Sequence, residues 1–265
     1  MTTVAPAGAP PEVAALAQAL HRARCAAQAM AQPDTPWLDV AAAYAVQHAG
    51  LALREAASER RCGVKMGFTS RAKMAQMGVH EMIIGQLTDA MQVEDGGTFA
   101  HGRAIHPRVE PELAMLVGRD LHAIEQPAQL ASAVEAVAPA MEIIDSRYAD
   151  FRFSLPAVVA DNTSGCGFVL GPWQRVPPRL DNLGIAMRVD GRVRQAGSSA
   201  AILGDPWRAL HAAWVLARRH GLQVGAGSVL LAGAATAAEP LQAGVSVMAE
   251  VAGLGRVGFR VEASA

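Results

Sequence analysis

Hydrophobic positions follow helical spacing in the first quarter of the chain. Residues 11–30 and 37–59 repeat apolar side chains every three or four positions. Both patterns predict amphipathic helices; the first has a proline suited to its first turn, and the second has Asp34 or Thr35 as its cap. They predict a helical N-terminal portion over residues 1–61.

The rest of the chain favours strands. Residues 62–70 (CGVKMGFTS), 105–118 (IHPRVEPELAMLVG) and 137–146 (VAPAMEIIDS) are apolar runs bounded by turn signals. Each predicts a buried strand. We expect a helix over 127–137 between the last two strands, and a short helix over 71–78 after the first.

The last third predicts further strands around one helix. Asp190-Gly191 is a strong turn signal in a hairpin over residues 183–197, and Asp205 caps a helix that ends at Gly221. Gly-rich turns separate three more strands, in GSVLLAG, VSVMAEV and RVGFRVE. This order predicts an α+β fold, with residues 62–265 forming one domain after the helical portion.

Three carboxylates stand out within the two central strands. Glu110 and Glu112 are two residues apart, so alternation along a strand places them on one face, about 7 Å apart. Glu142 lies in the apolar run AMEII, where an ionised acid needs a partner. Oxygen ligands of this kind suit a hard divalent cation, but paired acids are also typical of a strand's solvated face.

One lysine and one polar block give further candidates. Lys65 lies among Val, Met and Phe; its ammonium either reaches solvent along an apolar stem or points into a pocket. Within the block VVADNTSG (158–165), short polar side chains gather at residues 161–164 between apolar segments, and taken alone these four residues predict a turn.

Composition narrows the function classes. With 265 residues, 51% of them hydrophobic, the chain can form a large core. A net charge of −1 without a basic, aromatic patch argues against nucleic acid as a partner. We expect a cytoplasmic protein with no membrane span, because three scattered cysteines suit a reducing compartment and the N-terminus has no basic segment followed by an apolar run.

Four blocks in order resemble one family. KMGFTSRAKMAQMGV (65–79), IHPRVEPELA (105–114), MEIIDSRYADFRF (141–153) and VVADNTSG (158–165) are similar to the 2-oxo-3-hexenedioate (4-oxalocrotonate) decarboxylases and the related 2-hydroxypenta-2,4-dienoate hydratases. Both groups belong to the fumarylacetoacetate hydrolase superfamily. The resemblance runs from about Cys62 to the C-terminus.

The resemblance implies a mixed β-roll with a divalent metal, Mg²⁺ or Mn²⁺. Its metal ligands would be Glu110, Glu112 and Glu142, and Lys65 would be the pocket lysine that binds substrate and takes part in catalysis. Further residues implied to line the pocket are Asp161 as a catalytic group and Asn162 and Ser164 as substrate-binding groups.

The resemblance leaves two activities and one non-enzymatic role open. The Met-rich stretch after Lys65 favours decarboxylation of a 2-oxo dicarboxylate in the breakdown of aromatic compounds. The alternative is hydration of 2-hydroxypenta-2,4-dienoate to 4-hydroxy-2-oxopentanoate, with the Asp161 region as the nearest candidate base. A scaffold that has lost its chemistry is the third. The family also implies self-association and a complex between decarboxylase and hydratase.

Overall fold

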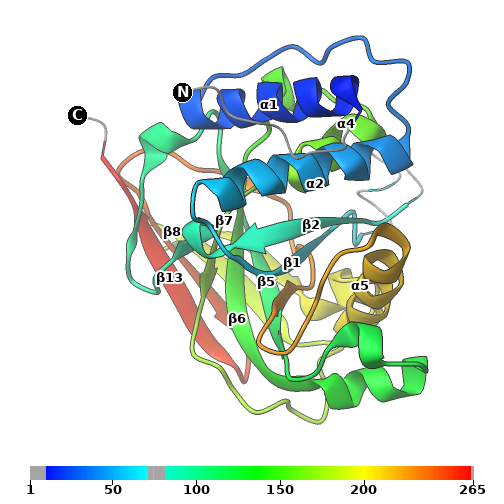
Figure 1. Cartoon of the computed structure of the whole chain (residues 1–265). Coiled ribbons are helices and arrows are strands. Elements are labelled where there is room, and N and C mark those ends of the chain that lie inside the picture. The colour runs from blue at the N-terminus through cyan, green and yellow to red at the C-terminus, as the bar shows by residue number, and fades with distance from the viewer. Residues whose placement is uncertain (1–9, 71–73, 75–80, 264–265) are drawn as a thin grey trace.

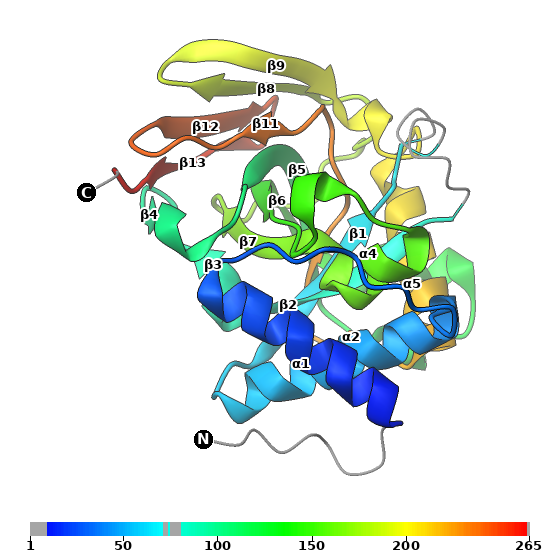
Figure 2. The ribbon, with the colours of Figure 1, turned by 90° about the horizontal axis from the view of Figure 1, so that it is seen from above.

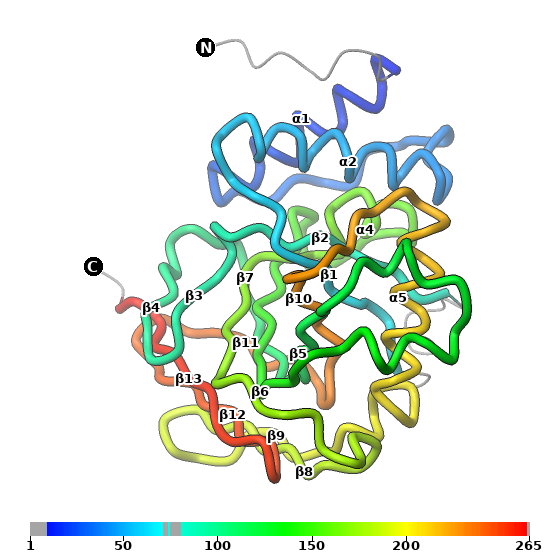
Figure 3. The backbone as a smooth tube through the Cα atoms, turned by 60° about the horizontal axis from the view of Figure 1, so that its bottom comes forward, coloured from blue at the N-terminus to red at the C-terminus, as the bar shows by residue number. Residues whose placement is uncertain are grey.

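The protein is built from two curved sheets and a helical layer. The structure, a computed structural model, describes residues 10–70, 74 and 81–263. Helices α1 (Pro11–Ala26) and α2 (Val40–Ala56) form one outer layer, the larger sheet lies in the middle, and the smaller sheet lies at the opposite end (Figure 3). Figure 1 shows α1 and α2 above β1 and β2.

Within the described residues, the larger sheet has eight strands and the smaller has five. The larger runs in the order β2-β1-β10-β5-β6-β7-β3, with β11 paired to β5, and the smaller runs β4-β13-β12-β8-β9. The strands of the larger sheet are β1 (Arg61–Gly67), β2 (Ile83–Thr88), β3 (Gln92–Val93), β5 (Arg108–Val117), β6 (Val134–Ile144), β7 (Gly165–Leu170), β10 (Val229–Leu231) and β11 (Glu239–Pro240). Those of the smaller are β4 (Thr98–Phe99), β8 (Gly184–Val189), β9 (Arg192–Ser198), β12 (Ser246–Val251) and β13 (Gly255–Val261).

The two sheets pack face to face. Side chains from β5, β6 and β7 meet side chains from β8, β12 and β13 in one apolar cluster, and Figure 2 shows β8, β9, β12 and β13 on one side of the molecule. This arrangement is the mixed β-roll of the α+β class that the family resemblance implied. The prediction of the fold is confirmed; the division of the chain at residue 61 stays a prediction.

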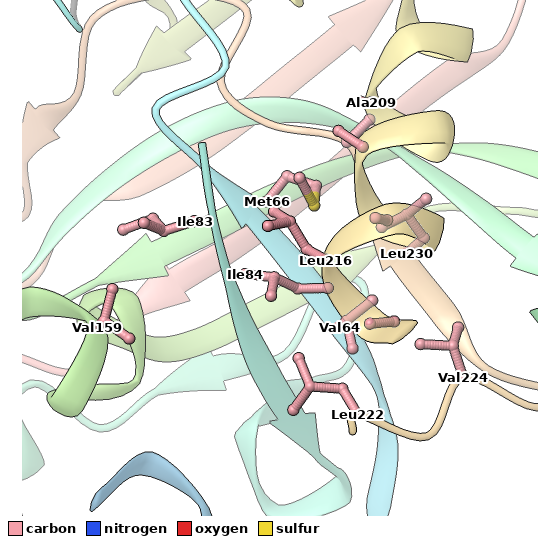
Figure 4. Packing of buried hydrophobic residues seen from close by; sticks show 14 of the residues in the cluster. Val64, Met66, Ile83, Ile84, Val159, Ala209, Leu216, Leu222, Val224 and Leu230 are labelled. Atoms are coloured by element: carbon pink, nitrogen blue, oxygen red, sulfur yellow. The ribbon is translucent and has the colours of Figure 1, made fainter. Parts of the chain in front are cut away.

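The main core lies between the helices and the larger sheet. Helix α5 (Pro206–His220) covers β1 and β10, and Figure 4 shows Met66 of β1 and Leu230 of β10 close to Ala209 and Leu216 of α5. Its ends match the sequence signals, since the Asp205 side chain accepts the amide of Trp207 and Gly221 adopts a left-handed φ of 68°.

A smaller core fills the inside of the roll. Ala114 of β5, Ala138 and Ala140 of β6 and Leu231 of β10 pack there with Phe168. Because side chains alternate along a strand, this face of β5 and β6 also carries Glu110, Glu112 and Glu142. The strand pattern therefore places the acids inside the roll.

Several predicted elements differ from the structure. The second helix starts at Val40 with Asp39 as its cap, so neither Asp34 nor Thr35 caps it. The helix predicted over 127–137 is a 3₁₀ turn from Pro127–Ala133, and the chain then enters β6, whose burial outweighs the helical propensity of its alanines.

The polar residues 161–164 form the predicted turn, directly after helix α4 (Leu155–Ala160), a helix that the sequence analysis did not predict. The helix predicted over 71–78 lies outside the described residues, apart from Met74. No helix of the described chain is both long and apolar enough to cross a membrane.

Candidate metal centre and catalytic cavity

Lys65 is buried at the end of the roll and points toward an acid. Only 4% of the residue is exposed, its Nζ lies 3.0 Å from Oε1 of Glu142, and it donates a hydrogen bond to the carbonyl of Thr163 at 3.0 Å. Of the two interpretations from sequence, this geometry matches the ammonium directed into a pocket.

The three predicted acids come together on neighbouring strands. Glu110 of β5 is the cross-strand partner of Glu142 of β6, and Glu112 follows on the same face of β5. Glu112 and Glu142 are 0% and 1% exposed, and Glu110 is 8% exposed. They are therefore not a solvated strand face.

Burial and mutual repulsion favour the protonated form of the buried acids. Burial, then the charges of Glu142 and Glu110, raise the pKa of Glu112 well above its usual range. Burial, then the charge of Glu110, raises the pKa of Glu142 to about 7, although Lys65 and a hydrogen bond with Glu112 oppose the rise. Without a cation, burial thus favours the protonated form of both Glu112 and Glu142.

The two carboxylate oxygens of Glu112 have different surroundings. Oε2 of Glu112 accepts the amide of Gly233 at 2.9 Å, whereas its buried Oε1 has no hydrogen-bond partner among the described residues. Within those residues, no three His, Cys, Asp or Glu side chains are already arranged to hold a metal ion. Metal ligation by the acids stays a prediction.

A cavity of about 330 Å³ opens beside Lys65. Glu110 and Glu142 lie at its charged end, and the remaining wall is largely apolar. Its lining residues are Lys65, Met66, Gly67, Phe68, Thr69, Ile83, Arg108, Glu110, Glu142, Ile144, Phe151, Phe153, Val158, Thr163, Ser164, Ala234, Ala237 and Ala238. A small organic acid with an apolar middle suits these walls.

Arg108 and Phe151 are cavity residues that the sequence analysis missed. The Arg108 guanidinium lies 4.5 Å from the centroid of the Phe151 ring, and Arg108 is exposed. The signal was present, because strand alternation places Arg108 on the same face as Glu110 and Glu112.

Ser164 belongs to this cavity, whereas Asp161 and Asn162 do not line it. The buried Oγ of Ser164 has no hydrogen-bond partner among the described residues. The Asp161 carboxylate pairs with Arg147 on the other side of the turn, and Asn162 hydrogen-bonds the backbone of Gln86 through both ends of its amide.

Burial raises the pKa of Asp161 to about 6, although Arg147 opposes the rise. The carboxylate faces a different cavity, which it shares with Gln47, Arg54 and Arg147. The structure therefore separates Asp161 and Asn162 from the site predicted to contain them. Their short polar side chains gave no indication of which way each would point.

Comparison with known proteins identifies the family. The profile of the fumarylacetoacetate (FAA) hydrolase C-terminal domain matches residues 46–262. The chain belongs to the fumarylacetoacetate hydrolase family. Among its relatives in this family is a 4-oxalocrotonate decarboxylase of a Pseudomonas species, 49% identical over 249 residues that cover 94% of this chain and 97% of the relative.

This chain is also similar to hydratases. A 2-keto-4-pentenoate hydratase of Burkholderia vietnamiensis is 35% identical over 92% of this chain and 95% of its own. A solved structure of a 4-oxalocrotonate decarboxylase from Pseudomonas putida G7, complexed with magnesium and adipate, superposes with a TM-score of 0.89 at 35% identity, covering 94% of this chain and 97% of the other.

Proposed function

We propose that the protein decarboxylates 2-oxo-3-hexenedioate (4-oxalocrotonate) to 2-hydroxypenta-2,4-dienoate and CO₂, with a divalent metal as cofactor. The observation that carries the proposal is the buried cluster of Lys65 and three glutamates, of which Glu110 and Glu142 line the same cavity as Lys65. The 49% identity to a 4-oxalocrotonate decarboxylase supports this activity.

The acids fit a hard cation. They offer only carboxylate oxygens, the ligands that Mg²⁺ and Mn²⁺ prefer, and Glu112 has a buried oxygen without a hydrogen bond among the described residues. Glu110, Glu112 and Glu142 would hold the ion, and magnesium in the similar decarboxylase supports its type. When bound, such an ion supplies Lewis-acid stabilisation of negative charge at the substrate's C2 oxygen.

Lys65 is suited to stabilise the negative charge that forms on the substrate when CO₂ leaves. Breaking the C5–C6 bond moves its electron pair through the C3–C4 double bond to the C2 oxygen. Lys65 is proposed to hydrogen-bond this oxygen and donate a proton to it, giving the dienol product. A lysine has three donors; among the described residues, Lys65 gives one to the Thr163 carbonyl, and its Nζ forms an ion pair with Glu142. Ser164, with its hydroxyl on the same wall, is proposed to bind the substrate near its C1 carboxylate.

The rest of the cavity suits the other half of a dicarboxylate. Arg108 is two residues from Glu110 on one strand, about 7 Å away, a length comparable to an extended six-carbon dicarboxylate. We propose that Arg108 attracts the distal carboxylate at the cavity mouth. Adipate, present in the similar decarboxylase structure, is also a six-carbon dicarboxylate.

Hydration of 2-hydroxypenta-2,4-dienoate is the second candidate, favoured by the similarity to hydratases. It needs a base to activate water. The acids among the described residues lining the cavity are Glu110 and Glu142, both already proposed as metal ligands, and Asp161 is bound to Arg147. This arrangement favours decarboxylation.

Two parallel assays test the choice. The purified protein with Mg²⁺ is given 2-oxo-3-hexenedioate in one and 2-hydroxypenta-2,4-dienoate in the other, while CO₂ and ultraviolet absorbance are followed. CO₂ from the first substrate, with no turnover of the second, is expected. Turnover of only the second would make the protein a hydratase, and no turnover of either would leave the scaffold role.

The cellular setting is part of the same proposal. We place the enzyme in the cytoplasm, in the degradation of aromatic compounds, where the three free cysteines suit a reducing environment. The product dienol is the substrate of the related hydratases, so a complex with such a hydratase, in addition to self-association, is proposed. Size-exclusion chromatography of the two proteins, alone and mixed, tests both associations.

A further inference from the structure

A strained turn lies beside the catalytic lysine. Asn162, Thr163 and Ser164 have φ angles of 48°, 51° and 58°, and none of them is glycine. Left-handed backbone is unfavourable for residues with a Cβ atom, especially a β-branched one such as threonine. Three in succession persist only where the surroundings hold them, and such strain is concentrated at functional sites.

The turn fixes the position of Lys65. The Thr163 carbonyl accepts a hydrogen bond from Nζ, and Gly85 is the cross-strand partner of Lys65. A Cβ atom at Gly85 would lie 2.2 Å from Thr163 Oγ1 and 3.0 Å from Lys65 Cδ. The turn, β2 and the lysine stem are therefore packed against one another, and a shift of the turn moves the ammonium.

Arg147 holds the turn from behind. Its Nη2 donates to the carbonyl of Asp161 just before the turn, and its Nη1 donates to the carbonyl of Gly165 just after it, at 3.2 Å. The Asp161 carboxylate completes the arrangement, accepting from Nε and from the main-chain amide of Arg147. Both side chains are almost completely buried, at 4% and 1% exposure.

A contribution to stability does not by itself account for this pair. Desolvation of two charges offsets much of their attraction, and well-packed apolar residues often replace buried ion pairs at no cost. What apolar residues cannot supply is the planar group that binds carbonyls on both sides of the turn.

We propose that Arg147 and Asp161 are positioning residues, which hold the left-handed turn at 162–164 so that its Thr163 carbonyl places Lys65 for proton transfer. The inference rests on the proposed function, because it assigns the lysine to that reaction. It makes Asp161 a residue that positions the turn, instead of one that contacts the substrate.

Arg147→Lys is the direct test, because lysine keeps the charge but cannot bind both carbonyls. Displacing a reacting group by about 1 Å costs about 100-fold in rate, so we expect kcat to fall about tenfold or more, with a smaller change in KM. Asp161→Asn, which removes the charge at nearly constant size, carries the same expectation and replaces the lysine variant if that one does not fold.

Arg54→Lys is the matched control. Arg54 is similarly buried in an ion pair, with Glu59, at 7% and 11% side-chain exposure, and its side chain donates hydrogen bonds to Glu59 and Thr88, which lie outside the turn. We expect it to lower thermal stability while kcat stays within about twofold. A comparable loss of kcat in Arg54→Lys and Arg147→Lys would overturn the proposal.

Amide hydrogen exchange of the metal-free protein gives a readout independent of activity. The amide of Asp145 bonds to the Ser164 carbonyl and the amide of Gln86 bonds to the Asn162 side chain, both at 2.8 Å. Both amides should exchange faster in Arg147→Lys than in the wild type, and their exchange rates should be unchanged in Arg54→Lys. A fall in kcat with unchanged exchange would overturn the proposal, as would an unchanged kcat.

Thr163→Gly, added to Arg147→Lys, tests the link to strain. Glycine adopts left-handed backbone at little cost and retains the carbonyl that binds Lys65, so kcat should recover at least in part although the ion pair stays broken. No recovery would contradict the proposed mechanism. If the wild-type protein releases no CO₂, the proposed function fails, while the exchange experiment still shows whether Arg147 holds the turn.

Discussion

Lys65 and Glu142 form a buried ion pair across the roll, with Nζ 3.0 Å from Oε1 and side-chain exposures of 5% and 1%. The lysine comes from β1 and the acid from β6, so the pair exists only once β10 and β5 have joined these strands in one sheet. Burial is the main reason why the pKa of Glu142 rises in spite of Lys65, and the charge of Glu110 adds to the rise.

The stability of the metal-free protein should fall as pH rises through this cluster. The folded-state pKa of Glu142, about 7, exceeds the unfolded value of 4.5, so the protonated acid favours folding at low pH. This contribution is complete below about pH 4.5 and is lost by about pH 7, with a change in the free energy of unfolding on the order of 3 kcal/mol. Urea unfolding at pH 5 and pH 8 with a chelator measures it.

Glu142→Gln is the control for that experiment. The variant has no titrating group at this position, so its unfolding free energy should depend less on pH, and it should exceed the wild type in stability at pH 8. Groups that titrate elsewhere are the same in both proteins, so their contributions cancel in the comparison. Equal pH dependence in the two proteins would show that Glu142 keeps an ordinary pKa.

Lys65→Met should separate metal binding from catalysis. Methionine retains most of the apolar stem but provides no proton, so kcat should fall about 100-fold or more. Mg²⁺ should bind at least as tightly, because Lys65 no longer competes for Glu142. Isothermal titration and initial rates measure both quantities. An unchanged kcat would remove Lys65 from the mechanism.

Arg108→Gln should affect recognition of the second carboxylate. We expect the KM for 2-oxo-3-hexenedioate to rise about tenfold, since a charged hydrogen bond from an exposed arginine contributes about 1.5 kcal/mol at most. Inhibition by a monocarboxylate 2-oxo acid should stay unchanged. Arg179→Gln, an exposed arginine paired with Asp181 outside the cavity, is the control and should behave as wild type. An equal loss of affinity for both acids would contradict the role of Arg108.

Gly233→Ala should damage the acid cluster through the backbone. Gly233 has φ +112°, its amide binds Glu112, and a Cβ atom would lie 2.0 Å from Thr69 Oγ1. The variant should lose more stability than the roughly 1 kcal/mol of an unfavourable φ, and its affinity for Mg²⁺ should decrease. Gly227→Ala has a similar positive φ with open space around it, and should show only the smaller loss. Thermal unfolding and metal titration compare the two.

Strand alternation was enough to predict that two of the acids share a face, but not that this face is buried. It placed Glu110 and Glu112 on one face, and the apolar run around Glu142 predicted a buried acid, both as the structure has them. Alternation could not predict that Glu110 pairs with Glu142, because the register between two strands depends on contacts distant in sequence. The same long-range packing decides that Lys65 is buried.

The orientations of the side chains in the turn at 161–164 could not be predicted from the sequence. Asp161, Asn162 and Ser164 have similar short polar side chains, and only the fold around Arg147 determines that one of them faces the cavity and two face away. Arg147 itself lies between the strand predicted over 137–146 and the block 158–165, and no pattern there indicated that it is buried. Local patterns predicted elements and faces, while tertiary contacts set the orientation of individual side chains.

Titration with Mn²⁺, followed by electron paramagnetic resonance, tests most directly whether the three glutamates form a metal site. The wild type and the exposed-surface variant Glu125→Gln should each bind one Mn²⁺ per chain, and Glu112→Gln should lose this binding together with CO₂ release. Unchanged Mn²⁺ binding by Glu112→Gln, or none by the wild type, would contradict the account.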